Sequence, residues 1–252
     1  MRYRGKEYTG AGVTVAVVDS GLNMNHPSME GAYADGWGLQ LGATGHALLS
    51  SNFYDDSGHG TMVASSILAV APDVRLLAIK IMGSDHKTSA ELMAAGIETA
   101  AKHGARVINL SLGTPNMGKA LLLRDCISNA VKAGCLVISS AHPKGERTYP
   151  ADLPEAVGVS SHLECPPDRY YYFDQNRFGK SEWGTLSGKF LAHGRDRLPD
   201  GSIGKYRGPG TATAHISGLA ACAASALPDT PQQILEVIEN QALIPVPEFG
   251  YN

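Results

Sequence analysis

The residue types that could do chemistry stand where predicted strands end and helices begin. Asp19 closes an apolar run over residues 13–18, and His59 lies between two glycines just before an apolar helical run over residues 62–70. A third segment, residues 208–218, is a glycine-rich entry into a helix of small residues. Singly, each has an ordinary structural explanation as a turn residue, a solvated side chain or close packing. Together they offer an imidazole, which can act as an acid or base near neutral pH, and a carboxylate to orient it.

The elements that must position these residues are predicted from hydrophobic patterning. Continuous apolar runs are typical of strands that are buried on both faces of a parallel sheet. Helical patterns alternate with these runs, so the chain is predicted to be an α/β protein with a doubly wound, mostly parallel sheet flanked by helices. In such sheets ligands bind outside the carboxyl ends of the strands. The predicted strands cover residues 13–18, 75–81, 106–112, 135–139 and 156–160.

Three helices are predicted from their capping signals. Residues 88–91 (Thr-Ser-Ala-Glu) read as a capping box that opens a helix to about His103, and Gly104 ends it. An apolar stripe from Leu123 to Val131 predicts the next helix, which Gly134 ends. Residues 230–233 (Thr-Pro-Gln-Gln) begin a C-terminal helix to about residue 241. The stretch 164–208 is expected to form loops and short hairpins.

Taken in chain order, these segments resemble the subtilisin-like serine peptidases, the subtilase family. Residues 16–22 with His26 and Pro27 are similar to the family's aspartate motif, and residues 58–64 are similar to its histidine motif, with Met62 where a second histidine is usual. Residues 70–81, 107–113 and 191–194 are similar to its central strands and to the loop before its nucleophile. The resemblance implies one subtilisin-like domain over residues 1–252, without a propeptide.

The resemblance also assigns roles to particular residues. In an intact member, His59 would take the proton of the nucleophile while Asp19 orients the imidazole. Ser111, Leu112 and Gly113 are similar to the strand that pairs with a bound peptide by β-augmentation. Thr88 and Ser89 are expected on the opposite edge of the same groove, although they also serve as a helix cap.

The nucleophile motif departs from the family pattern G-T-S-x-A-x-P-H-V-x-G. Aligning back from His215 places Gly210 at the serine. A rival alignment puts Ala212 there, but it deletes two residues from a helix and turns the nucleophile by about 200°. Neither alignment leaves a serine, and Thr211 lies about 100° out of register.

A second departure concerns the oxyanion hole, where the family has an asparagine in A-G-N-x-G. Here residues 140–145 read Ser-Ala-His-Pro-Lys-Gly, so His142 takes the place of the asparagine. Loss of that asparagine in subtilisin lowers the rate by about 10²–10³. A neutral imidazole can still donate one hydrogen bond, with a different reach.

Composition excludes several other classes of protein. The formal charge of −3 argues against a nucleic-acid or anionic-membrane partner, and no segment at the N-terminus reads as a signal peptide. The four cysteines form no metal-binding spacing, so neither a metal nor a cofactor is expected, and the protein is expected in the cytoplasm.

Three interpretations follow. The first is a proteolytically inactive domain that binds a peptide or protein segment. The second is an enzyme of another class, in which His59, oriented by Asp19, and His142 act as acid and base on a small molecule or modified peptide. The third is a serine endopeptidase silenced by substitution of its serine.

Overall fold

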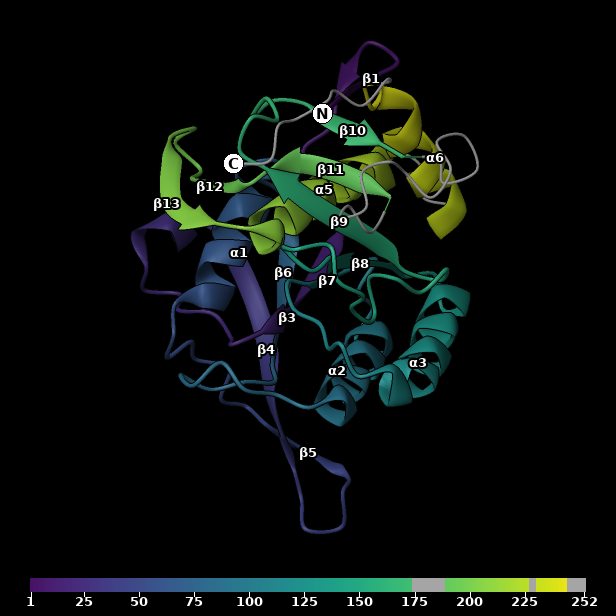
Figure 1. Ribbon diagram of the computed structural model, residues 1–252. Coiled ribbons are helices and arrows are strands. Elements are labelled where there is room, and N and C mark those ends of the chain that lie inside the picture. Colours follow the sequence, from purple (N-terminus) through teal and green to yellow (C-terminus); the bar gives the residue numbers. More distant parts are fainter. Residues whose placement is uncertain (174–188, 227–229, 244–252) are drawn as a thin grey trace.

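The computed structural model describes residues 1–173, 189–226 and 230–243 (Figure 1). Within these residues one large sheet has the strand order β10-β11-β9-β8-β7-β3-β6-β4-β5. Its two outermost pairs, β10 with β11 and β4 with β5, are antiparallel, and all the pairs between them are parallel. The strands of this sheet are β3 (Thr14–Asp19), β4 (Tyr33–Leu41), β5 (Ala47–Ser50), β6 (Arg75–Lys80), β7 (Val107–Leu110), β8 (Leu136–Ser140), β9 (Val157–His162), β10 (Tyr170–Tyr172) and β11 (Phe190–His193).

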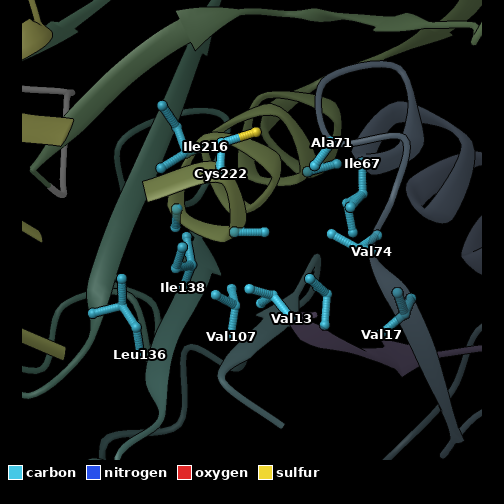
Figure 2. Close-up of a cluster of buried hydrophobic side chains, with 14 of the residues drawn as sticks. Val13, Val17, Ile67, Ala71, Val74, Val107, Leu136, Ile138, Ile216 and Cys222 are labelled. Atoms are coloured by element: carbon cyan, nitrogen blue, oxygen red, sulfur yellow. The ribbon is translucent and has the colours of Figure 1, made fainter. Parts of the chain in front are cut away.

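Helices cover both faces of the sheet, which confirms the predicted doubly wound α/β fold. On one face α1 (His59–Leu68), α5 (Pro209–Ala226) and α6 (Pro231–Gln241) pack over a core that includes Val17, Ile138 and Ile216 (Figure 2). On the other face α2 (Ala90–Lys102) and α3 (Ala120–Lys132) pack side by side. No helix in the described part of the chain is long and apolar enough to cross a membrane.

Short elements complete the fold. Two small hairpins stand apart from the large sheet, and two 3₁₀ turns lie between β3 and β4 and directly before α3. The hairpins are β1 (Arg2–Tyr3) with β2 (Lys6–Glu7), and β12 (Arg195–Arg197) with β13 (Ile203–Arg207); the 3₁₀ turns are Pro27–Met29 and Met117–Lys119.

The boundaries of α6 and α3 agree with their predicted signals. Thr230 and Gln233 form the expected capping box at the start of α6, and Gly134 has the left-handed φ of +96° that ends α3. At α2 the prediction was wrong by one residue. Ser89, not Thr88, is the N-cap and accepts from the Leu92 N–H, while the Thr88 hydroxyl donates to the Ile81 carbonyl.

The expectation of loops and hairpins over residues 164–208 is correct only in part. The hairpin β12–β13 is present, but β10 and β11 extend the large sheet, and residues 190–193 form a strand rather than a loop. The rest of that stretch, 174–188, lies outside the described residues.

Candidate active site

Asp19 and His59 are joined side chain to side chain, as the sequence predicted. His59 Nδ1 lies 2.7 Å from Asp19 Oδ1, although 40 residues separate the two in the chain. Asp19 is the last residue of β3 and is fully buried, and His59 is the first residue of α1 with about a quarter of its side chain exposed. The fold therefore holds one edge of the imidazole and leaves the other edge open.

The pKa of His59 reflects this environment. Burial alone would lower the pKa of the imidazole. The hydrogen bond to Asp19 and the negative charges of Asp19 and Asp55 outweigh burial, so the pKa lies above its usual 6.5. The charged form of His59 is thus stabilised by two buried carboxylates.

Asp55 fixes the loop that carries His59. Its buried carboxylate accepts from the Thr61 hydroxyl at 2.6 Å, the Ser20 hydroxyl at 2.8 Å and the backbone N–H groups of Ser57, Gly58 and Thr61. Burial raises the pKa of Asp55, but these hydrogen bonds outweigh it and hold the pKa below its usual range. The Asp55 carboxylate thereby holds both the end of β3 and the start of α1 in place.

Asp55→Asn is expected to lower the free energy of unfolding by about 3 kcal/mol at pH 7, because buried donors lose a charged acceptor. The pKa of Asp55 is lowered in the folded state, so its stabilisation is present above pH 4 and is lost as the pH falls through the folded-state pKa. Urea unfolding of both proteins between pH 3 and 7 measures the difference.

The matched control for this experiment is Asp56→Asn. Asp56 is adjacent but half exposed, and it pairs with Lys80. A surface ion pair contributes less than about 1 kcal/mol, so this variant should unfold almost as the natural chain does. Equal losses in the two variants would contradict the role given to Asp55.

A cavity of about 350 Å³ opens beside His59, at the carboxyl end of β7 and the start of α5. Strand β3 has β6 on one side and β7 on the other, so the strand order reverses there, as at the ligand sites of other doubly wound sheets. The lining residues are His59, Met62, Ser111, Leu112, Gly113, Ser140, Ala141, His142, Pro143, Thr148, Tyr206, Arg207, Gly208, Pro209, Gly210 and Thr211.

Gly210 lies in the first turn of α5 and lines this cavity. A Cβ on Gly210 would approach Ser111, at 3.2 Å from its Cβ. Ala212, the alternative alignment position, is fully buried in the core and is absent from the cavity wall. The hydroxyls of Thr211 and Thr213 donate back to the carbonyls of residues 208 and 209, each at 2.7 Å. Neither threonine presents a free hydroxyl to the cavity.

His142 lines the same cavity as His59, as the sequence analysis expected. Its Nδ1 accepts from the Lys144 N–H at 3.3 Å, so a neutral His142 carries its proton on Nε2. The neutral ring therefore keeps one N–H, on Nε2, that can donate a hydrogen bond. This is the chemical capacity that the alignment with the oxyanion asparagine requires.

Ser111, Leu112 and Gly113 form one wall of the cavity between β7 and Thr114. Thr114 pairs with Tyr149 through two backbone hydrogen bonds of 2.8 Å, whereas Ser111, Leu112 and Gly113 make no backbone–backbone hydrogen bond to any described residue. Their backbone donors and acceptors include the edge that a bound peptide could pair with.

Thr88 and Ser89 do not line the cavity; they hold the start of α2. Three other residues near the site were not predicted from the sequence. Tyr206 and Arg207, from β13, form part of the cavity wall, and the ring of His86 lies 6.0 Å from that of His59, centroid to centroid. No pattern in the sequence brings these residues to the site, because their positions depend on tertiary packing.

Comparison with known proteins gives the family. Residues 10–251 match the model of the subtilase family. The chain is 30% identical to a subtilisin of Bacillus pumilus, covering 97% of this chain and 88% of that protein, and 30% identical to subtilisin E of Bacillus subtilis, covering 93% of this chain and 61% of that protein.

Comparison with solved structures leads to the same family. Sphericase superposes with a TM-score of 0.74 at 25% identity, covering 93% of this chain and 84% of that chain. The S41 psychrophilic protease gives a TM-score of 0.74 at 25% identity, covering 92% and 83%. With an Asp–His pair at the carboxyl edge of a doubly wound sheet, the chain belongs to the subtilase family.

Proposed function

We propose that this chain is a proteolytically inactive subtilase domain that binds an extended peptide or protein segment in its cleft. The observation that carries the proposal is Gly210, which lines the cavity with His59 and has no side chain to acylate. The register that places Gly210 at the family's serine is favoured because the rival residue, Ala212, is buried in the core. His59 then has no hydroxyl to activate, and acyl-enzyme formation through that residue cannot occur.

Peptide binding is supported by the wall over residues 111–113. One side of this segment packs on Thr148 and Tyr149, so closely that a Cβ on Gly113 would lie 2.7 Å from the Thr148 hydroxyl. The Leu112 carbonyl accepts from the Ser139 hydroxyl at 3.3 Å, and the backbone groups of residues 111–113 make no backbone–backbone hydrogen bond to a described residue. A peptide added as a strand there would gain main-chain hydrogen bonds without chemistry on its carbonyls.

The proposal predicts no hydrolysis together with retained binding. The protein should release no dye from labelled casein, and a fluorophosphonate should leave its mass unchanged. An array of immobilised ten-residue peptides should identify binders. For such a binder, N-methylation at alternate residues should weaken binding at least tenfold, because it removes the N–H groups that pair with residues 111–113.

Two results would overturn the proposal separately. Stoichiometric fluorophosphonate labelling would disprove inactivity, and peptide mapping would identify the nucleophile, with Ser111 and Thr211 the first residues to check. Binders that tolerate N-methylation at every position would disprove main-chain pairing while leaving the question of hydrolysis untouched.

A second candidate function is favoured by one observation, that His59 and His142 line one cavity. In this reading His59, held by Asp19, and His142 are the base and acid of a different reaction on a small molecule or modified peptide. Once a substrate is found, His142→Asn and His59→Ala should each abolish turnover. If His142 only fills the former oxyanion hole, His142→Asn should leave ligand affinity unchanged.

A further inference from the structure

The open edge of His59 has the properties of a metal ligand. Nδ1 is hydrogen-bonded to Asp19, so a neutral ring carries its proton there and presents a lone pair at Nε2. Nε2 has no hydrogen-bond partner in the described part of the chain. A histidine that gives one N–H to a carboxylate and uses its other nitrogen as ligand is the usual arrangement around zinc in proteins.

A second imidazole stands beside this edge. The ring of His86 is 6.0 Å from that of His59, centroid to centroid, and nearly perpendicular to it at 85°. His86 is exposed, and its ring makes no hydrogen bond within the described residues. Two imidazole rings therefore lie next to each other beside the cavity, and neither His59 Nε2 nor the His86 ring has a hydrogen-bond partner among the described residues.

The backbone of His86 is held in an unusual conformation. Its φ is +54°, in the left-handed region that glycine favours, and its N–H donates to the Gly83 carbonyl at 3.1 Å. The Lys87 N–H donates to the Asp85 carboxylate, and Thr88 is tied to Ile81, so the loop is fixed on the far side as well. Residues held in this region cluster at functional sites.

The spacing of the two rings fits a shared ion. With Zn–N bonds of about 2.1 Å, each ring centroid lies about 3.2 Å from the metal, so two rings on one tetrahedral ion have centroids about 5.2 Å apart. The upper limit, reached when the two rings lie opposite each other across the ion, is about 6.4 Å. The observed 6.0 Å lies within this range, and a small rotation of the exposed His86 ring brings it to the tetrahedral value.

Charge around the site also favours a cation. Asp19 is fully buried; its Oδ1 contacts both the Ser20 N–H and His59 Nδ1 at 2.7 Å, and its Oδ2 has no hydrogen-bond partner among the described residues. Asp55 accepts from the N–H groups of Gly58 and Thr61 and so offsets the positive end of α1. A cation bound near the start of α1 is therefore repelled less than it would be if no carboxylate accepted from these N–H groups.

We propose that His59 and His86 bind one divalent transition-metal ion, Zn²⁺ in the first instance, beside the cavity, with Asp19 orienting His59. The described residues hold no group of three or more histidine, cysteine, aspartate or glutamate side chains that could bind a metal. The proposal leaves the remaining coordination positions to water. This site goes beyond the proposed function and holds whether or not the protein hydrolyses peptides.

The test is a titration of the purified protein with Zn²⁺ against a chromophoric chelator, in the natural chain and in variants. One ion per chain is expected, and His86→Asn and His59→Gln should each weaken binding at least tenfold. Asp19→Asn should weaken it by about 10–100-fold, the usual effect of losing the partner of a ligating histidine. Asparagine tolerates a left-handed φ, so His86→Asn keeps the loop conformation.

His46→Asn is the matched control, because His46 is also an exposed loop histidine but lies in the turn between β4 and β5. It should bind Zn²⁺ like the natural chain. Co²⁺ gives a second readout: the natural chain should show visible absorption of a low-symmetry complex, and His86→Asn should lose it. Undiminished Zn²⁺ affinity in His86→Asn, or equal losses in His46→Asn, would overturn the proposal.

Discussion

Gly60→Ala is expected to destabilise the protein by about 3 kcal/mol or more and to separate His59 from Asp19. A Cβ at this position would collide with the backbone carbonyl oxygen of Gly21 and lie 3.3 Å from the Asp19 Cβ. The obstacle is backbone at the end of β3, so no side-chain rotation can relieve it. The start of α1 must move away from the strand, and the 2.7 Å contact between His59 and Asp19 is lost with it.

Two measurements check this expectation. Urea unfolding gives the loss of stability, and NMR titration gives the pKa of His59, which should fall from its raised value once Asp19 is out of reach. Gly83→Ala is the control, because the nearest atom to its added Cβ is 3.8 Å away and its φ is not positive. A Gly60→Ala protein as stable as the control, with the His59 pKa unchanged, would refute the argument.

The central strands could be predicted from sequence because their environment is uniform. β3, β6, β7 and β8 are buried on both faces, so apolar side chains occupy most of their positions. The strand β4 was not predicted from the sequence, because glycines interrupt it. Gly36 and Gly38 stand where the Ala78 and Asn52 carbonyl oxygens approach too closely for any Cβ, yet in sequence such glycines read as turns.

The residues of the site also differ in whether the sequence could predict them. Asp19 and His59 could be predicted because each carries its own local motif at the end of an element. His86, Tyr206 and Arg207 could not, because each reaches the site from a loop or hairpin whose position is set by distant packing. Thr88 and Ser89 are the opposite case. The sequence predicted them on the edge of the peptide groove, but their hydroxyls hold the start of α2 and lie outside the cavity wall.

Gly210→Ser is expected to create a slow, His59-dependent reaction with a fluorophosphonate. Gly210 does not have a positive φ, so a serine fits its backbone. Its Cβ would lie 3.2 Å from the Ser111 Cβ, a contact relieved by a shift of a few tenths of an ångström. Adding His59→Ala should abolish the labelling, because no base would then remain beside the new hydroxyl.

The double variant Gly210→Ser, His142→Asn should react faster than Gly210→Ser alone, by at most about 10²–10³-fold, because an asparagine amide donates to the oxyanion with the reach that the family uses whereas the imidazole N–H has a different reach. Mass spectrometry over time gives both rates. Ala212→Ser is the matched control for register: Ala212 is fully buried and outside the cavity wall, so its serine should stay unlabelled. Labelling of Ala212→Ser with an inert Gly210→Ser would place the nucleophile position two residues later in α5. Equal rates in the single and double variants would instead contradict the expected difference in reach between the His142 imidazole and an asparagine amide.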